Sequence, residues 1–552
     1  MQIQQEAFKE FIENKDKKDF DRIKIQISKK YKLKKIPKNI DLLLKDPKSN
    51  IITKPTRTIS GVTPVAIMTR PEKCPHGVCT FCPGGPDSIL GNVPQSYTGN
   101  EPASMRAIRN KLDPYLQVFN RLEHYALLNQ NFNKCEVIIM SGTFLSSDKE
   151  YINEFLTYTY KAFNDFGNLF FKNKELQFNK FKKFFQLDGD FKDPIRIEKI
   201  QKKLLKFKNK TTLKQEQEKN ETSNCRVVAL CIETKPDWSK EEHINNMLNL
   251  GTTRVELGIQ TLNDETLKKV NRGHSLKDSI EATQLLKDSF LKVTYHMMPG
   301  LPNSNKQKDV KMFKDLFSNE NYKPDSLKIY PCLVMPGTPL YQQWKQGKFK
   351  PITTADASER ISEAKKYIPE YCRIMRIQRD IPTKVTSAGV DKTNLRQYIS
   401  KLVAKKGIIC KCIRCREPRN REIDFNNVKI LTKDYKASKG TEIFISMEDV
   451  KNNILLGFVR LRIPYKPFRK EITKDSAGIR ELHVYGTSTQ LEKKGNIQHQ
   501  GLGKKLMLEA EKIAKEKYNI KKLLVISGIG VKEYYQNNFN YKKDGPYLSK
   551  IL

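Results

Sequence analysis

Three cysteines stand close together near the start of the chain, in the segment KCPHGVCTFCPGGPDS. Cys74, Cys79 and Cys82 have the spacing C-x4-C-x2-C. A structural zinc site needs four ligands, and no second cysteine pair follows within about 50 residues. Three thiolates instead suit a 4Fe-4S cluster whose fourth iron is open to another ligand. The spacing therefore favours an iron–sulfur centre, with zinc as the alternative.

A second cysteine group lies much later in the chain, in CKCIRCRE. Cys410, Cys412 and Cys415 supply up to three thiolates for a structural zinc ion. Cys332, Cys372 or a histidine could be the fourth ligand. The alternative is a set of unligated thiols in a reducing compartment.

The C-terminal region carries a pattern of a different kind. QHQGLG (498–503) fits (Q/R)-x-x-G-x-(G/A) immediately before a long amphipathic stretch. A helix that begins there directs free backbone N–H groups at a pyrophosphate. The strand pattern ELHV (481–484) precedes this loop, and LLVISG followed by KEYYQNNF comes after it.

This order of elements resembles the GNAT acetyltransferase domain, which has an α+β fold. In that family one strand pairs its backbone with the pantetheine amides of acetyl-CoA, and a tyrosine lies beside the thioester. The resemblance implies that Tyr535 is catalytic, and that Tyr534 is the second candidate, with a core aromatic as the alternative. The implied contacts of acetyl-CoA are Glu481, Leu482, His483, Val484, Leu502, Gly503, Lys504 and Tyr535.

Short apolar runs alternate with amphipathic segments between the first cysteine group and about Pro331. An extended run around Val65 and Ile67 predicts a buried strand ahead of the cysteines. Ser239 and Asn263 are the expected N-caps of two intervening helices. Strand and helix in alternation predict parallel βαβ units, and so an α/β barrel or an open sheet. Further strands are predicted at 135–142, 226–234, 253–261, 292–300 and 326–331.

These patterns divide the chain into four parts. We expect a basic N-terminal region, an α/β domain, a linker that holds the second cysteine group, and an α+β domain rich in antiparallel strands. A Lys-, Phe- and Asn-rich insertion interrupts the α/β domain, and a solvated helical excursion is favoured there over a direct RNA contact. The expected bounds are 1–60, 61–330, 331–419 and 420–552, with the insertion at about 165–223.

The chain is strongly basic. Lys and Arg number 101 against 62 acidic residues, which gives a net charge of +39. An excess of this size favours a nucleic acid as partner, because each neutralised phosphate releases counterions; a lysine-rich solvated surface is the alternative. No apolar run approaches the ~20 residues that cross a bilayer, and the N-terminus lacks the apolar segment of a secretory signal. We therefore expect a cytoplasmic protein without membrane contact.

Three cysteines on a loop after the first strand of such a barrel resemble the radical S-adenosylmethionine (SAM) superfamily. In that superfamily the open iron chelates SAM, which is cleaved to a 5′-deoxyadenosyl radical. The resemblance implies that residues at the carboxyl ends of the strands bind SAM, although the last two of them could instead cap helices or pair with neighbours. These residues are Ser141, Gly142, Glu233, Gln260 and Arg272.

A radical-SAM barrel and a GNAT domain in one chain resemble the elongator protein three family, the catalytic subunit of Elongator. The resemblance rests on CTFCPGGPDS, QSYTGNEPASMRAIR, LKIYP, PGTPLY, RIQRDIP, CIRCRE, RELHVYG and QHQGLG. It implies synthesis of 5-carboxymethyluridine at tRNA position 34 from acetyl-CoA and SAM. Lys134 would contact acetyl-CoA from the barrel side and take part in catalysis.

The same resemblance implies the partners. The basic N-terminal region and the barrel face would bind the tRNA anticodon stem-loop, an electron donor would reduce the cluster, and other Elongator subunits are further candidates. The main alternative is a protein lysine N-acetyltransferase with a structural iron–sulfur cluster. A radical-SAM methylthiotransferase and an RNA-binding scaffold without catalysis are the remaining alternatives.

Overall fold

The computed structural model describes residues 2–17, 19–49, 51–53, 60–190, 193–419, 421–486 and 501–552. Its first sheet has seven strands, and every neighbouring pair is parallel. The five strands predicted after the cysteines and the buried strand ahead of them are all present. In spatial order the strands are β1 (Thr63–Met68), β2 (Lys134–Met140), β5 (Arg226–Thr234), β6 (Arg254–Gln260), β7 (Lys292–Met297), β8 (Ser326–Ile329) and β9 (Arg373–Ile377).

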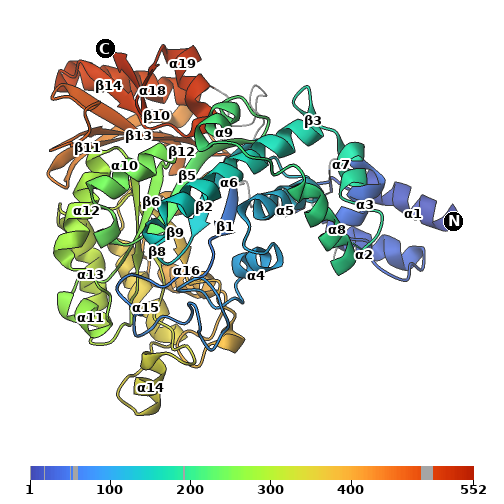
Figure 1. Cartoon of the computed structure of the whole chain (residues 1–552), viewed down its shortest axis with the longest axis horizontal. Coiled ribbons are helices and arrows are strands. Elements are labelled where there is room, and N and C mark those ends of the chain that lie inside the picture. The colour runs from blue at the N-terminus through green and yellow to red at the C-terminus, as the bar shows by residue number, and fades with distance from the viewer. Residues whose placement is uncertain are drawn as a thin grey trace.

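Helices cross between these strands and cover the outside of the sheet (Figure 1). Asn263 is the N-cap of α11, as predicted, because its side chain accepts from the backbone N–H of Thr266. The prediction for Ser239 is wrong, since α10 takes Lys240 as its N-cap and the Ser239 hydroxyl donates to the carbonyl of Lys235. The helices are α4 (Pro102–Arg109), α5 (Pro114–Leu127), α10 (Glu241–Asn249), α11 (Asp264–Lys269), α12 (Leu276–Asp288) and α13 (Lys306–Ser318).

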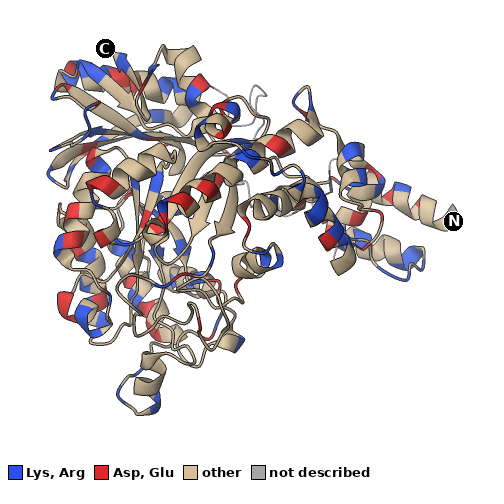
Figure 2. Cartoon of the chain, in the orientation of Figure 1, with Lys and Arg blue, Asp and Glu red and all other residues tan. Residues whose placement is uncertain are grey.

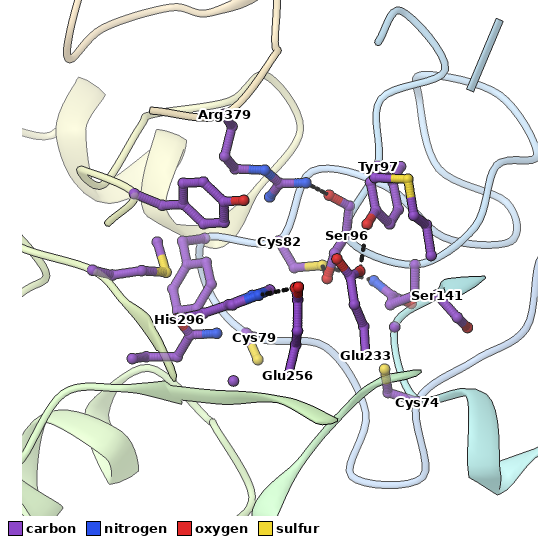
Figure 3. A pocket seen from close by; sticks show the side chains of 18 of the residues that line it. Cys74, Cys79, Cys82, Ser96, Tyr97, Ser141, Glu233, Glu256, His296 and Arg379 are labelled. Carbon is purple, nitrogen blue, oxygen red and sulfur yellow. Dashed lines mark hydrogen bonds and ion pairs between the residues drawn. The ribbon is translucent and has the colours of Figure 1, made fainter. Parts of the chain in front are cut away.

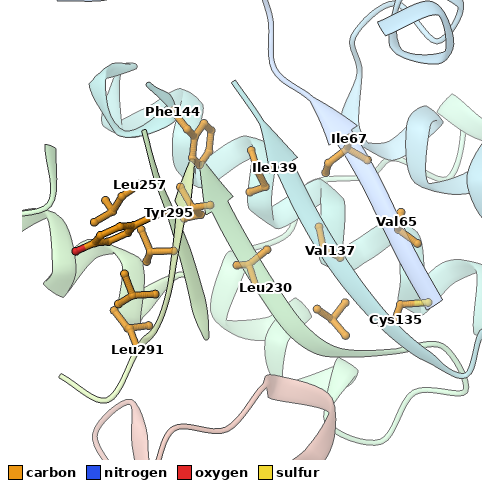
Figure 4. Close-up of a cluster of buried hydrophobic side chains, with 14 of the residues drawn as sticks. Val65, Ile67, Cys135, Val137, Ile139, Phe144, Leu230, Leu257, Leu291 and Tyr295 are labelled. Atoms are coloured by element: carbon orange, nitrogen blue, oxygen red, sulfur yellow. The ribbon is translucent and has the colours of Figure 1, made fainter. Parts of the chain in front are cut away.

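The main core lies where the parallel strands meet these helices. Val65, Val137 and Leu230 come from three neighbouring strands, and each is at most 1% exposed (Figure 4). Near-continuous burial along β6 follows from coverage on both faces, as parallel sheets require. Of the helices that the structure describes, none combines the length and the apolar character that a membrane span needs.

The insertion between β2 and β5 is helical, but it is less solvated than predicted. Phe166, Phe170, Phe181 and Phe185 are fully buried against one another, with ring centroids 4.8–6.4 Å apart. Its phenylalanines therefore form core, and its lysines supply the exposed face. The elements are α6 (Lys149–Phe170), β3 (Phe171–Lys172), β4 (Glu175–Leu176), α7 (Phe178–Phe184), α8 (Pro194–Leu205) and α9 (Leu213–Asn220).

Three N-terminal helices extend away from the barrel beside α7 and α8 (Figure 1). They are held together by a small apolar cluster of their own that includes Phe11, Phe20 and Leu42. Lys and Arg recur along these helices and along the insertion (Figure 2). The bounds are α1 (Gln2–Glu13), α2 (Phe20–Lys30) and α3 (Asn39–Lys45).

The predicted linker contributes to the first sheet, because β9 pairs with β8. The boundary expected at residue 330 therefore does not end this sheet. A strand that late in the chain could not be assigned from its short apolar pattern alone. The other elements of the segment are α14 (Pro339–Lys345), α15 (Thr354–Ala364), α16 (Leu395–Lys405) and α17 (Ile413–Arg416).

A second sheet follows, mostly antiparallel as expected, with only β13 and β14 parallel. β13 pairs with β14 at 476–479 and continues beyond it, so the two strands separate along 481–484. The order is β10 (Val428–Ala437), β11 (Gly440–Asp449), β12 (Ile454–Ile463), β13 (Ser476–Val484), β14 (Lys522–Val525), β16 (Tyr547–Ile551) and β15 (Lys542–Asp544), with α18 (Leu502–Lys512) and α19 (Lys532–Phe539).

Buried ion pairs join the two sheets. Arg480 on β13 reaches Asp325, at the amino end of β8, at 2.6 Å and Glu442 at 2.9 Å. Arg462 on β12 reaches Asp288, at the end of α12, at 2.6 Å. All five side chains are at most 1% exposed. The second sheet is therefore fixed against the amino ends of the barrel strands.

Candidate functional site

The three cysteines of the first group lie on the loop after β1, at the carboxyl ends of the barrel strands. They line an open pocket (Figure 3). Chain segments that follow β2, β5 and β6 line the same pocket. All five residues predicted to bind SAM are among its walls: Ser141, Gly142, Glu233, Gln260 and Arg272.

Polar groups surround the cysteine sulfurs. The side-chain amide of Gln95 donates to Cys82 at 2.9 Å, and Thr143 lies 3.6 Å from Cys74. Burial raises the pKa of the Cys74 thiol, and partners that stabilise the thiolate oppose this. Such contacts to sulfur are what a thiolate-bound cluster requires.

The spacing of these sulfurs also fits a cluster better than a single ion. Among the described residues, two groups have possible ligand atoms all within 4.8 Å of one another, and the Cys74 group is not one of them. Four thiolates on one zinc ion stand roughly 3.8 Å apart, given bonds of about 2.3 Å. Thiolates on a four-iron cluster stand farther apart, because the cluster lies between them.

Two local features shape the pocket beside the cysteines. A Cβ at Gly142 would lie 2.7 Å from Cβ of Gln95 and 3.0 Å from the sulfur of Cys74, so only glycine permits this approach. Gln260 has a φ of +71°, and its side-chain carbonyl oxygen is buried with no partner among the described residues. An acceptor left unpaired at the wall of a pocket fits a ligand that donates a hydrogen bond, such as the ammonium group of SAM.

Arg272 lies at the same end of the pocket. Its guanidinium donates to the carbonyl of Gly258 at 2.9 Å and to the sulfur of Cys79 at 3.7 Å. A Cβ at residue 258 would lie 2.3 Å from this guanidinium, so glycine is needed there as well. The position of Arg272 beside Cys79 would suit the carboxylate of SAM, and its hydrogen bonds to Gly258 and Cys79 also match the predicted alternative of pairing with neighbours.

A buried charge network forms the floor of the pocket, and sequence reasoning found only one of its members. Lys328 makes an ion pair with Glu233 at 3.3 Å and another with Glu256. His296 lies 2.7 Å from Glu256, and the hydroxyl of Tyr97 donates to Glu233 at 2.6 Å. Glu256 and Lys328 are polar residues inside the patterns of β6 and β8, and such a pattern alone does not show which ion pairs they make.

The network determines the charge of Glu256. Burial alone would raise the pKa of Glu256, but the cations of Lys328 and Arg254 outweigh it and hold this pKa well below its usual range. Glu233, Glu256 and His296 form the second compact group of possible metal ligands. The ammonium of Lys328 already supplies a positive charge to both carboxylates of this group.

A second candidate site lies at the separation of β13 and β14. A Cβ at Gly503, in the first turn of α18, would lie 3.1 Å from the hydroxyl of Tyr534, 3.7 Å from Val484 and 3.8 Å from Leu482. The helix start, the end of β13 that separates from β14, and one tyrosine hydroxyl therefore meet at one place. Gln498 to Gln500 of the loop motif lie outside the described residues.

The structure separates the two candidate tyrosines. Tyr535 packs in the core of the second sheet against Phe539 and Tyr541. It is Tyr534, rather than Tyr535, whose hydroxyl faces Gly503. The sequence could not show which of the two adjacent tyrosines points into the core, because either could have been the core residue.

Lys134 does not line the cysteine pocket. It begins β2, so it lies roughly 20 Å from Ser141 at the other end of that strand. Its register partner Arg226 pairs with Glu533 of α19 at 3.0 Å. Lys134 is therefore near the helix that carries the tyrosines, and burial lowers its pKa to about 8.

The second cysteine group is compact. The sulfurs of Cys410, Cys412 and Cys415 lie within 4.8 Å of one another, which suits one metal ion. Hydrogen bonds from the other two thiols hold the pKa of Cys415 below its usual range, and Lys365 lies 3.7 Å from its sulfur. Within the described residues, neither Cys332 nor Cys372 belongs to this group.

Comparisons with known proteins agree with this geometry. A model of the radical SAM superfamily matches residues 68–316, and a model of the radical SAM C-terminal domain matches residues 324–405. The chain is 46% identical, over its full length and 98% of the relative, to the tRNA uridine(34) acetyltransferase of Methanocaldococcus infernus. The chain belongs to the Elongator protein 3 family.

Two further relatives support this membership. Elongator complex protein 3 of Saccharomyces cerevisiae is 37% identical over 95% of this chain and 90% of its own. The solved structure of Methanocaldococcus infernus Elp3, which lacks residues 1–46, has a TM-score of 0.73 and 42% identity and covers 90% of this chain and 100% of its own. The family resemblance and the α/β fold class predicted from the sequence are therefore confirmed. Membership in the radical SAM superfamily implies a 4Fe-4S cluster and SAM.

Proposed function

We propose that this protein modifies uridine 34 of tRNA, forming 5-carboxymethyluridine from acetyl-CoA by radical chemistry. The observation that carries this proposal is the presence of two sites in one chain. A cysteine pocket with room for SAM lies at one end of the barrel, and a strand separation beside α18 lies at the other. The relative from Methanocaldococcus infernus, similar along the whole chain, is named a tRNA uridine(34) acetyltransferase.

The residues of the first site would hold the cluster and SAM. Cys74, Cys79 and Cys82 supply three thiolates, and the pocket walls at Gly142, Gln260 and Arg272 fit the amino acid part of SAM. When bound, these groups would supply the one-electron radical chemistry of the radical SAM superfamily. Ser141 and Glu233 complete the wall, and Lys328 keeps the Glu233 carboxylate paired.

The residues of the second site would hold acetyl-CoA. The part of β13 that β14 does not pair with, over Glu481, Leu482, His483 and Val484, would bind the pantetheine amides through its backbone. The first turn of α18, with Leu502, Gly503 and Lys504, offers N–H groups to the pyrophosphate. Tyr534 faces this place and is the better candidate for a contact with the thioester. We retain Lys134 as a contact from the barrel side.

The other expected components rest on less direct support. We infer that Cys410, Cys412 and Cys415 hold a structural zinc ion, because their sulfurs are as close as one ion needs. The basic N-terminal region, in which α2 carries an excess of Lys and Arg, would receive the anticodon stem-loop. An electron donor and other Elongator subunits would be the protein partners, and the cytoplasm would be the compartment.

The test is anaerobic reconstitution of the protein with iron and sulfide, followed by incubation with tRNA, SAM, acetyl-CoA and a reductant. Nucleoside mass spectrometry should then detect 5-carboxymethyluridine. A variant with Cys74, Cys79 and Cys82 changed to alanine should form none. Acetyl-lysine on a protein substrate, formed equally well by that variant, would instead support the lysine acetyltransferase. Absence of the modified uridine despite an intact cluster would refute the proposal.

A further inference from the structure

The loop after β9 forms one wall of the cysteine pocket. It carries the motif RIQRDIP, to which the proposed function gives no role. Arg376, Arg379 and Asp380 all line the pocket, and Arg379 lies across it from Cys74 and Cys79 (Figure 3). The side chains of Arg376 and Asp380 are 42% and 52% exposed, so this wall is on the solvent side. A substrate that enters from solvent would pass it first.

Arg379 differs from the charged residues around it. Arg376 is paired with Asp380 at 2.8 Å, and the acidic side chains Glu233 and Glu256 are paired with Lys328. Among the described residues, no carboxylate lies within ion-pair distance of Arg379. A guanidinium at the wall of a pocket without a carboxylate partner is a site for an anionic ligand.

Other contacts hold Arg379 in place without a carboxylate partner among the described residues. Its guanidinium donates one hydrogen bond to the backbone carbonyl of Ser96 and lies 5.4 Å over the ring of Tyr97. A guanidinium has five N–H donors, so most of them stay available. Tyr97 is fixed in turn by its hydrogen bond to Glu233 on the pocket floor. The cation is therefore positioned before any ligand binds.

We propose that Arg379 binds a backbone phosphate of the RNA next to the nucleotide that enters the pocket. This inference rests on the proposed function, in which the substrate is a tRNA. The ligand class is a phosphodiester of single-stranded RNA, whose two free oxygens match the guanidinium fork. Phosphate contacts of this kind fix position without reading sequence, so Arg379 places the nucleotide and other residues select the base.

Other anions in the reaction have better partners elsewhere. The carboxylate of SAM fits Arg272, beside the sulfur of Cys79. The phosphates of acetyl-CoA fit the first turn of α18, on the second sheet. This leaves the RNA backbone as the anion that approaches from the exposed wall.

The test compares the full-length protein with Arg379→Gln and Arg379→Lys in binding a labelled anticodon stem-loop RNA over a range of salt concentrations. Arg379→Gln should weaken binding about tenfold and lower the salt slope by about 0.7. The loss should be equal for stem-loops with uridine or cytidine at position 34, because a phosphate is contacted. Arg379→Lys should recover part of the affinity. The matched control is Lys521→Gln, which removes a 73% exposed charge on the second sheet and should bind as the wild type does.

Three outcomes would overturn the inference. The first is wild-type affinity and salt slope in Arg379→Gln. The second is a loss of affinity confined to the stem-loop with uridine at position 34. The third is a loss of iron or a lower unfolding temperature in Arg379→Gln while the salt slope stays unchanged. The last would make Arg379 a support for Ser96 and Tyr97. In the modification assay, Arg379→Gln should raise KM for tRNA and leave kcat nearly unchanged. Failure of the wild type to form 5-carboxymethyluridine would refute the proposed function, whereas the binding result would still decide this inference.

Discussion

The two ends of the barrel use the same charged residue types in opposite ways. At the amino ends of the strands, arginines such as Arg480 and Arg462 are fully buried, and each is paired with carboxylates. At the carboxyl ends, Arg272 and Arg379 line an open pocket, and among the described residues neither has a carboxylate within ion-pair distance. The first arrangement joins two parts of the protein, and the second leaves charge available to ligands.

The difference shows how burial decides the role of a charge. A buried ion pair must be complete, because a charge left without its partner is strongly unfavourable in a low-dielectric interior. Arg379 is only partly buried, so water solvates its cation until an anion replaces the water. Stability and ligand binding should therefore respond separately to changes at the two ends.

The largest expected effect is at the closed end. Arg480→Met should destabilise the protein by about 3–5 kcal/mol, because Asp325 and Glu442 would lose a partner inside the interface. The measurement is chemical or thermal unfolding of wild type and variant. Arg379→Gln is the matched control at the open end and should change stability by less than about 0.5 kcal/mol. Equal losses of stability in both variants would contradict the proposed difference between the two ends of the barrel.

The second prediction uses the pH dependence of the closed end. Burial lowers the pKa of Lys134 to about 8, below the value near 10.4 of an unfolded chain. Between these values the unfolded state binds the extra proton, so stability should rise with pH over about 8 to 10.4, by up to about 3 kcal/mol. The penalty is fully present below pH 8. Lys134→Met should lose this rise, as seen in unfolding at pH 7, 9 and 10.5; an unchanged pH profile would contradict the burial of this lysine.

The third prediction concerns space at the open end. Gly142→Ala should weaken SAM binding about tenfold or more, because the new methyl group would contact the sulfur of Cys74 and the side chain of Gln95. Equilibrium binding of SAM to the reconstituted protein measures this, with iron content as a check on the cluster. Gly189→Ala is the control, since nothing lies within 4 Å of a Cβ there. Normal SAM affinity in Gly142→Ala would place SAM elsewhere.

The smallest effect separates the two tyrosines. Tyr534→Phe should slow turnover of acetyl-CoA about fivefold, the size of one lost hydrogen bond of about 1 kcal/mol. Tyr535→Phe should leave turnover nearly unchanged, because its ring lies in the core. Initial rates of CoA release in the presence of tRNA compare them. A larger effect of Tyr535→Phe than of Tyr534→Phe would instead support Tyr535, the residue predicted from the motif, as the contact with the thioester.

Much of the site was predictable because its signals are local in the sequence. Cys74, Cys79 and Cys82 stand within one loop, and their spacing alone favours a cluster. Ser141 and Glu233 could be placed because both follow apolar strand patterns, and parallel strands bring their carboxyl ends to one edge. Lys328 and His296 were missed because a single polar residue within a strand pattern gives no sign of which ion pair it makes.

The amino acid sequence by itself determined the family and the order of elements, and it indicated the three cysteines proposed to hold the cluster, since each depends on residue type and spacing along the chain. Only the tertiary structure decided which tyrosine faces Gly503 and which charges are left unpaired. Pairing depends on contacts between residues far apart in sequence, as with Arg480 and Asp325 or with Arg379 and Ser96. A charge has a partner or lacks one only after the chain has folded around it.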